Sequence, residues 1–224
     1  MNPADVTLMI FAAGFGTRMG DLTQSTPKPM LPLRGKPMID HTLEIAKKAE
    51  LEAIFANTHY LNDQIAPHLE SRGVTVLHET PDILDTGGGL KAARARLSSP
   101  TLTLNPDYDW SGPNPLAHLL EHWRDDMEAL LLLVPPNRAK NRTGSGDFTL
   151  NEGIPTRGGE MIYTGAQLIR TERLADISDN VFSLNTYWDH LASTGDLHGT
   201  IYPGTWTDIG TKQALIRANE ANNV

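Results

Sequence analysis

The sequence contains no cysteine among its 224 residues. This absence excludes disulfide bonds and metal sites built from thiolates, and it agrees with a reducing compartment. Long apolar runs are also missing, because the apolar stretch 8–13 is too short to span a membrane and no basic segment precedes it. We therefore expect a cytoplasmic protein without a membrane partner.

Positive charge is scarce as well. The chain has 19 lysine and arginine residues against 27 aspartate and glutamate residues, which gives a net charge of −8. A protein that binds nucleic acid usually carries a broad basic surface, so we expect no nucleic-acid partner. An anionic small molecule would need a few positive groups set locally against this negative field.

Apolar segments alternate with segments of helical spacing over the first part of the chain. The expected strands are 7–12, 53–57, 74–78, 101–104 and 129–134. The expected helices are 37–50, 62–70, 88–97 and 115–124. This alternation predicts an α/β fold with a mainly parallel sheet covered by helices. Ligands of such sheets bind beyond the carboxyl ends of the strands, so the loops after the first and fourth strands are the places to look for chemistry.

The residue composition changes near residue 135, where polar residues and glycines become frequent. We expect a small antiparallel insertion here, with 148–150 and 161–164 as strands, and a last helix over 211–221. The length suits a single domain. We divide it into a part of about 1–134 and a second part of about 135–224.

The first expected strand runs directly into the small and glycine-rich segment Ala12–Arg18. Small residues let a backbone approach a phosphate closely and direct N–H groups toward it. No glycine stands three residues after Gly16, which argues against a dinucleotide-dependent oxidoreductase, and no Walker lysine follows. Taken alone, this segment is explained equally well as a tight turn.

A lysine between two prolines follows at Lys28. Prolines stiffen the backbone and fix the direction in which the ammonium group points. Phosphoryl transfer depends mainly on positioning and on neutralisation of charge, so a fixed lysine suits that chemistry. Taken alone, Lys28 is explained more simply as an exposed residue of a proline-rich loop.

Together, the glycine loop, Arg18 and the Pro-Lys-Pro segment resemble the signature of the sugar-nucleotide pyrophosphorylases, and the likeness extends over residues 10–38. The resemblance implies a three-layer, Rossmann-like nucleotidyltransferase fold and an enzyme that acts on a nucleoside triphosphate and a sugar 1-phosphate. It implies that Arg18 stabilises charge at the reacting centre and that Lys28 holds phosphate oxygens. The residues that the resemblance assigns to the nucleotide are Ala12, Ala13, Gly14, Gly16, Thr17, Gly87 and Gly88.

Two aspartates far apart in the sequence resemble the metal ligands of this family. Asp107 follows the strand 101–104, and Asp208 precedes the last helix. A carboxylate at a strand end suits Mg²⁺, a hard cation that binds one or two carboxylates together with phosphate oxygens. Asp109 competes with Asp107 as a ligand, and Asp208 alone could be a turn residue. Pro106 departs from the family pattern, which usually has a small residue there.

The second part of the chain resembles the sugar-binding part of the family. Residues 144–148 resemble a Gly-Arg-Gly-Asp-Phe element in which Ser145 replaces the arginine. Residues 163–166 resemble the strand that lines the sugar pocket. The candidate sugar contacts are Asn105, Asp147, Thr164 and Gly165.

These elements most resemble the subfamily of uridylyltransferases that act on N-acetylmuramate 1-phosphate in bacterial cell-wall recycling. The resemblance therefore implies UTP and this sugar phosphate as substrates. A transferase for glucose or mannose 1-phosphate is an alternative. A second alternative is a non-catalytic module that binds a nucleotide or a sugar phosphate, for which Pro106, Ser145 and Asp21 argue. The sequence does not indicate the oligomeric state.

Overall fold

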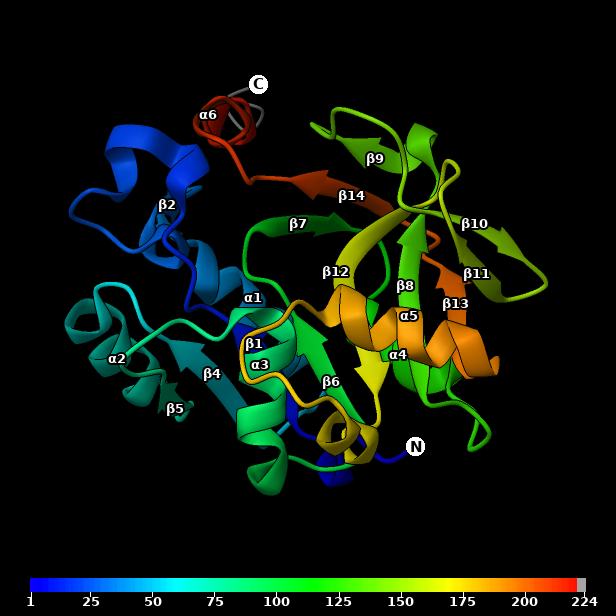
Figure 1. Ribbon diagram of the computed structural model, residues 1–224. Coiled ribbons are helices and arrows are strands. Elements are labelled where there is room, and N and C mark those ends of the chain that lie inside the picture. The colour runs from blue at the N-terminus through cyan, green and yellow to red at the C-terminus, as the bar shows by residue number, and fades with distance from the viewer. Residues whose placement is uncertain (221–224) are drawn as a thin grey trace.

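The computed structural model describes residues 1–220, and its centre is a seven-stranded sheet (Figure 1). The strand order is β13-β8-β12-β6-β1-β4-β5. The strands are β1 Leu8–Phe11, β4 Ile54–Thr58, β5 Thr75–His78, β6 Thr101–Leu104, β8 Ala129–Val134, β12 Ile162–Ile169 and β13 Leu197–Ile201. Only β12 runs antiparallel to its neighbours in this sheet. The predicted, mainly parallel sheet is confirmed.

Helices cover both faces of the sheet. Successive strand residues point to opposite sides, and because they are apolar on both sides, each face needs a covering layer. Leu8 and Ile10 belong to one apolar cluster, and Met9 between them belongs to the other. The first cluster includes residues of α1 Met38–Lys48, α2 Asn62–Glu70 and α4 Pro115–His122. The second includes residues of α3 Asp85–Ala93 and α5 Leu184–Thr194, which lie in front of the sheet in Figure 1. The result is a three-layer α/β/α arrangement.

Local sequence explains several of these helix ends. The side chain of Asn114 accepts hydrogen bonds from two backbone N–H groups at the start of α4, and Pro115 takes the first helical position, where no N–H is needed. Ser183 caps α5 in the same way. That helix ends at Gly195, whose φ of 80° is left-handed and suits glycine. The last helix, α6, covers Lys212–Glu220. The end of the predicted helix 211–221 lies outside the described residues.

A smaller, three-stranded sheet stands beside the central one. Its order is β7-β14-β9, and its strands are β7 Tyr108–Ser111, β14 Thr205–Asp208 and β9 Ala139–Lys140. Strand β7 follows β6 after a short turn. Strand β14 pairs with β7 in antiparallel orientation. Two hairpins complete the strands, β2 Pro32–Leu33 with β3 Lys36–Pro37, and β10 Phe148–Asn151 with β11 Ile154–Arg157.

Two predictions about these elements were wrong. The strand expected at 161–164 in the small insertion is β12, which continues to Ile169 and lies in the middle of the central sheet. The continued strand pairs with β6 on one side and β8 on the other, and both of its faces are buried. This burial on both faces extends the strand. The helix expected from residue 88 begins at Asp85, so the three glycines lie inside α3 and not before it.

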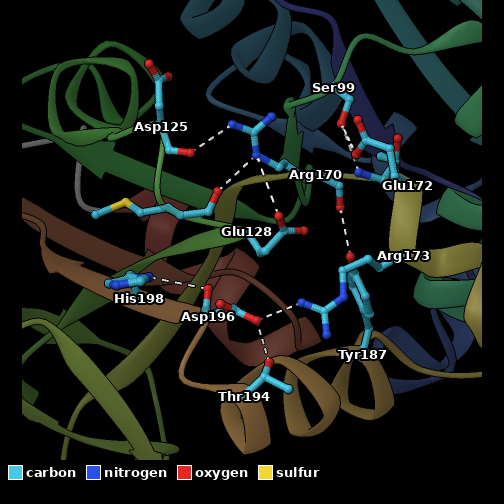
Figure 2. A network of polar contacts seen from close by, with 12 residues as sticks. Ser99, Asp125, Glu128, Arg170, Glu172, Arg173, Tyr187, Thr194, Asp196 and His198 are labelled. Carbon is cyan, nitrogen blue, oxygen red and sulfur yellow. Dashed lines mark hydrogen bonds and ion pairs between the residues drawn. The ribbon is translucent and has the colours of Figure 1, made fainter.

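A network of polar contacts links strand ends on the side of the sheet opposite the carboxyl ends of the parallel strands (Figure 2). Arg170, just after β12, donates to the backbone carbonyl oxygens of Met127 at 3.1 Å and Asp125 at 3.2 Å. Arg173 donates to Asp196 at 2.7 Å, just before β13. These contacts join the ends of three neighbouring strands. Within residues 1–220, no helix is long and apolar enough to cross a membrane.

Candidate active site

The loop after β1 forms one wall of a cavity of about 270 Å³. Gly16 has a φ of +66°, and a Cβ there would lie 2.8 Å from the Cβ of Lys28. Both observations require glycine at this position. The loop residues that line the cavity are Ala12, Ala13, Gly14, Gly16, Thr17 and Arg18.

Lys28 lies under this loop and also lines the cavity. Its side chain is 13% exposed, and its ammonium group donates directly to Oδ2 of Asp107. The Arg18 guanidinium is more exposed and lies 4.0 Å from the same carboxylate oxygen. The structure therefore brings together both cations that the sequence predicts, next to one of the two predicted metal ligands.

The small sheet places Asp208 beside Asp107. Asp208 pairs in register with Tyr108, and the Ile209 N–H donates to the Asp107 carbonyl oxygen at 3.0 Å. Both aspartates are about 8% exposed. Burial raises the pKa of the Asp208 carboxyl, the N–H of Gly210 lowers it, and the neighbouring Asp107 carboxylate raises it further. Two buried carboxylates at one place favour a bound cation.

Asp109, the competing ligand candidate, is engaged elsewhere. Its two carboxylate oxygens accept hydrogen bonds from the Arg34 guanidinium, one of them at 2.7 Å. Such a bidentate pair leaves little capacity for a metal. Asp109 is also absent from the residues that line the cavity, whereas Asp107 is among them. The arrangement favours Asp107 over Asp109.

The four candidate sugar residues are placed differently from one another. Asn105 lines both this cavity and a second one. Gly165 lies behind Asn105, to which it is joined by a backbone hydrogen bond, and a Cβ on Gly165 would lie 2.2 Å from the Tyr108 ring. Thr164 is fully buried and donates to the Leu132 carbonyl oxygen, so its hydroxyl faces the core.

Asp147 lines the second cavity, but both of its carboxylate oxygens are engaged. One accepts from the Tyr163 N–H at 2.9 Å, and the other accepts from the Arg142 guanidinium at 3.1 Å. Asp147 therefore fixes the loop to β12 and holds an arginine at the cavity.

Gly87 and Gly88 do not reach either cavity. Their N–H groups both donate to the carbonyl oxygen of Phe182, and a Cβ on either would collide with the segment 180–182. The structure thus gives these glycines a packing role, since they let α3 approach that segment closely. Asp85 and Thr86, at the start of the same helix, line both cavities instead.

Two buried polar residues of the first cavity were missed from the sequence. Asn57, at the end of β4, accepts from the Ala12 N–H at 2.9 Å and donates to Glu79 at 2.7 Å. Glu79 accepts from the Leu84 N–H at 2.8 Å. This chain of bonds fixes the glycine loop relative to the start of α3. Polar residues at or just after the carboxyl ends of apolar strands were the signal that could have identified them.

The second cavity has a volume of about 310 Å³ and continues from the first. Phe11, Asp85, Thr86 and Asn105 line both. Five of its other lining residues are aromatic, namely Tyr108, Phe148, Tyr163, Trp188 and Trp206. Aromatic walls with a few polar groups suit a small polar molecule that must be oriented. A cavity lined by Lys28 and Arg18 is thus continuous with a second cavity whose lining suits a small polar molecule.

The sequence matches known families and proteins. Residues 8–178 match the family of MobA-like NTP transferase domains. The N-acetylmuramate alpha-1-phosphate uridylyltransferase of Caulobacter vibrioides is 32% identical over 97% of this chain and 97% of its own length. The protein of the same name from Neisseria meningitidis is 32% identical over 91% of this chain and 92% of its own. The mannose-1-phosphate guanylyltransferase of Mycobacterium tuberculosis is 27% identical over 98% of this chain and 65% of its own.

Solved structures agree in fold. HddC from Yersinia pseudotuberculosis has a TM-score of 0.80 at 21% identity, over 96% of this chain and 99% of that chain. A putative glucose-1-phosphate thymidylyltransferase from Bacillus anthracis has a TM-score of 0.79 at 20% identity, over 96% of this chain and 94% of that chain. The predicted Rossmann-like nucleotidyltransferase fold is confirmed.

Proposed function

The chain belongs to the family of MobA-like NTP transferase domains and is a sugar-1-phosphate nucleotidyltransferase, and we propose that its substrates are UTP and N-acetylmuramate 1-phosphate. The support for these substrates is the 32% identity to two uridylyltransferases over nearly their full lengths. The support for the site is one observation: Arg18, Lys28 and Asp107 converge on a single cavity from three separate segments of the chain, and the pairing of β14 with β7 places Asp208 beside Asp107.

The proposed reaction is a direct displacement. An oxygen of the sugar phosphate attacks the α-phosphorus of UTP and forms a new P–O bond. The bond from the α-phosphorus to the bridging oxygen breaks, and pyrophosphate leaves with the electron pair. Lys28 holds phosphate oxygens, and Arg18 neutralises charge that develops at the α-phosphate. The exposed Arg18 side chain is free to move onto the phosphates, whereas the buried Lys28 is held in place.

Asp107 and Asp208 are the proposed ligands of a divalent metal ion, and Mg²⁺ is the ion that we expect. The residues fit such an ion, because two largely buried carboxylates lie side by side and burial raises the pKa of the Asp208 carboxyl. A hard cation bound there would supply positive charge to the phosphate oxygens. The same proposal places the protein in the cytoplasm, where UTP is available.

A panel of nucleoside triphosphates and sugar 1-phosphates tests the substrates. Each pair is mixed with the enzyme and MgCl₂, and pyrophosphate release is measured. UTP with N-acetylmuramate 1-phosphate should give the highest kcat/KM. A higher kcat/KM for GTP with mannose 1-phosphate would replace the proposed substrates with those named for the Mycobacterium tuberculosis relative. Release with no pair, despite nucleotide binding, would favour a non-catalytic module.

A further inference from the structure

Two arginines line the second cavity but not the first. Arg142 comes from the loop that precedes β10, and Arg157 ends β11. The phosphate of the sugar must reach Lys28 and Arg18, which line the first cavity. The residues shared by the two cavities include no arginine or lysine. A sugar whose phosphate binds Lys28 and Arg18, as proposed above, would extend into the second cavity and have Arg142 and Arg157 on the side remote from its phosphate.

Arg142 is anchored and still able to bind. Its side chain is 31% exposed, and within residues 1–220 its guanidinium forms one hydrogen bond, from Nη2 to Asp147 at 3.1 Å. Asp147 is itself held by the Tyr163 N–H. A guanidinium has five N–H donors in a fixed plane, so the remaining donors of Arg142 are positioned but unused.

Arg157 is engaged more completely. Its Nε donates to Asp189 at 2.7 Å, and its Nη2 donates to the Asn185 carbonyl oxygen at 3.1 Å. Its guanidinium carbon lies 4.9 Å from the centre of the Phe148 ring. These contacts hold Arg157 flat against the wall of the cavity. It is therefore a matched control, an arginine of the same cavity that is held by two hydrogen bonds and by its contact with an aromatic ring.

The charges around the cavity identify what Arg142 can bind. The acidic side chains that line it are Asp85 and Asp147, and Asp147 is neutralised by Arg142 itself. A sugar hydroxyl could accept one bond from the remaining donors, but a carboxylate can accept two in the plane of the guanidinium, and both would be charge-assisted. Ser145, where the resemblance to the family leads one to expect arginine, lies three residues from Arg142 along the same loop.

Resting on the proposed function, we infer that Arg142 is a specificity-determining residue that binds an acidic substituent of the sugar. The second cavity accordingly takes a sugar 1-phosphate that carries a carboxylate. N-acetylmuramate 1-phosphate has such a group on its lactyl ether, and N-acetylglucosamine 1-phosphate is the same sugar without it. This pair isolates the contribution of the carboxylate.

The test compares this pair of substrates in three proteins: wild type, Arg142→Gln and Arg157→Gln. The wild-type enzyme should prefer the acidic sugar phosphate. Arg142→Gln should lose roughly 10- to 100-fold in kcat/KM for the acidic sugar, the range expected for a charge-assisted hydrogen bond. Its kcat/KM for the neutral sugar should change less than about threefold, a tolerance that allows for context-dependent effects. Arg157→Gln should keep the preference.

A second measurement separates this inference from the proposed function. Binding of free N-acetylmuramate and free N-acetylglucosamine is compared by ligand-detected NMR in the presence of UTP and MgCl₂. Turnover of neither sugar phosphate would contradict the proposed substrates, while preferential binding of N-acetylmuramate that is lost in Arg142→Gln would still support the role of Arg142. An equal loss for both sugars in Arg142→Gln, or a preference that survives this change, would overturn the inference.

Discussion

At the residue scale, Lys28 and Asp107 pair directly with each other. The ammonium group that we assign to phosphate and the carboxylate that we assign to the metal both lie at one buried point, with exposed fractions of 13% and 12% for the two side chains. Their pairing lowers the cost of burying each charge. Arrival of a metal-bound triphosphate would give each group a new partner of the appropriate sign.

This pairing predicts that Asp107→Asn lowers both stability and activity. The change leaves the buried Lys28 ammonium without its carboxylate, and breaking a buried pair in this way costs about 3–5 kcal/mol. Thermal unfolding without ligands should show the loss, and pyrophosphate release should be nearly abolished. Asp109→Asn serves as the control, because Asp109 pairs with Arg34 outside the cavity. Equal activity of wild type and Asp107→Asn would remove Asp107 from the proposed metal site.

The glycine loop gives a second prediction at this scale. Gly16→Ala places a Cβ at a left-handed φ and 2.8 Å from the Lys28 side chain. The left-handed backbone alone costs roughly 1–2 kcal/mol, and the contact would displace Lys28. We expect lower kcat and a lower melting temperature. Gly35→Ala is the matched control, since Gly35 also has a left-handed φ, of +82°, but a Cβ there would have no heavy atom within 4 Å and Gly35 lines neither cavity. Identical kinetics for the two variants would contradict a fixed loop.

At the scale of elements, the sequence predicted the parts of the fold that depend on local patterns. Helix α2 and strands β6 and β8 have the predicted bounds, because runs of apolar or periodic residues define them. Strands β7 and β14 were not predicted. Both are short and hold aromatic residues whose burial depends on packing between distant segments, such as the tilted contact of Tyr108 with Trp206.

The same limit applies to the site. The cations and the aspartates could be predicted because each stands in a recognisable local motif. The roles of Asn57 and Glu79 could not, because they depend on contacts between β4, β5 and the start of α3. Arg142 carried no local signal either, and only the folded loop brings it to Asp147.

The polar network of Figure 2 predicts how stability depends on pH. The Thr194 hydroxyl and the Arg173 guanidinium lower the pKa of the Asp196 carboxyl. Because the folded state favours the ionised form, this stabilisation is present above the unfolded pKa and is lost as pH falls through the folded pKa. Asp196→Asn should therefore be less stable than wild type at pH 7, by about 1 kcal/mol or less for so exposed a pair. Urea unfolding at pH 7 and near pH 3 checks this, and a difference that is equal at both pH values would contradict it.

At the scale of the whole molecule, this acidic protein places positively charged side chains in two adjoining cavities. The net charge is −8, yet Arg18 and Lys28 meet at the first cavity and Arg142 lies at the second. A bound divalent cation would add to this local positive charge. The strands from the second part of the chain complete both the central sheet and the small sheet, so the two substrates would meet between elements from both parts.

This arrangement predicts that the enzyme depends on a divalent cation. Removal of metal with EDTA should stop turnover, and MgCl₂ in excess should restore it. The melting temperature should rise more with UTP and MgCl₂ together than with either alone, because Asp107 and Asp208 need both charge and phosphate oxygens to complete the site. Full turnover in EDTA would contradict the proposal that Asp107 and Asp208 bind a catalytic metal ion. Arg18 and Lys28 would then neutralise the phosphate charge without a metal.

Lys28 is the residue on which transfer of the nucleotide should depend most, because it is buried in the first cavity and held in place there. The most direct measurement is ³¹P NMR of a reaction that contains UTP, N-acetylmuramate 1-phosphate and MgCl₂, with wild type, Lys28→Ala and Lys36→Ala. Lys36 is the control, because it pairs with Glu44 away from the cavity. We predict UDP-N-acetylmuramate and pyrophosphate with wild type and Lys36→Ala. A folded Lys28→Ala should form neither product. Product formation by Lys28→Ala at the wild-type rate would contradict this role of Lys28.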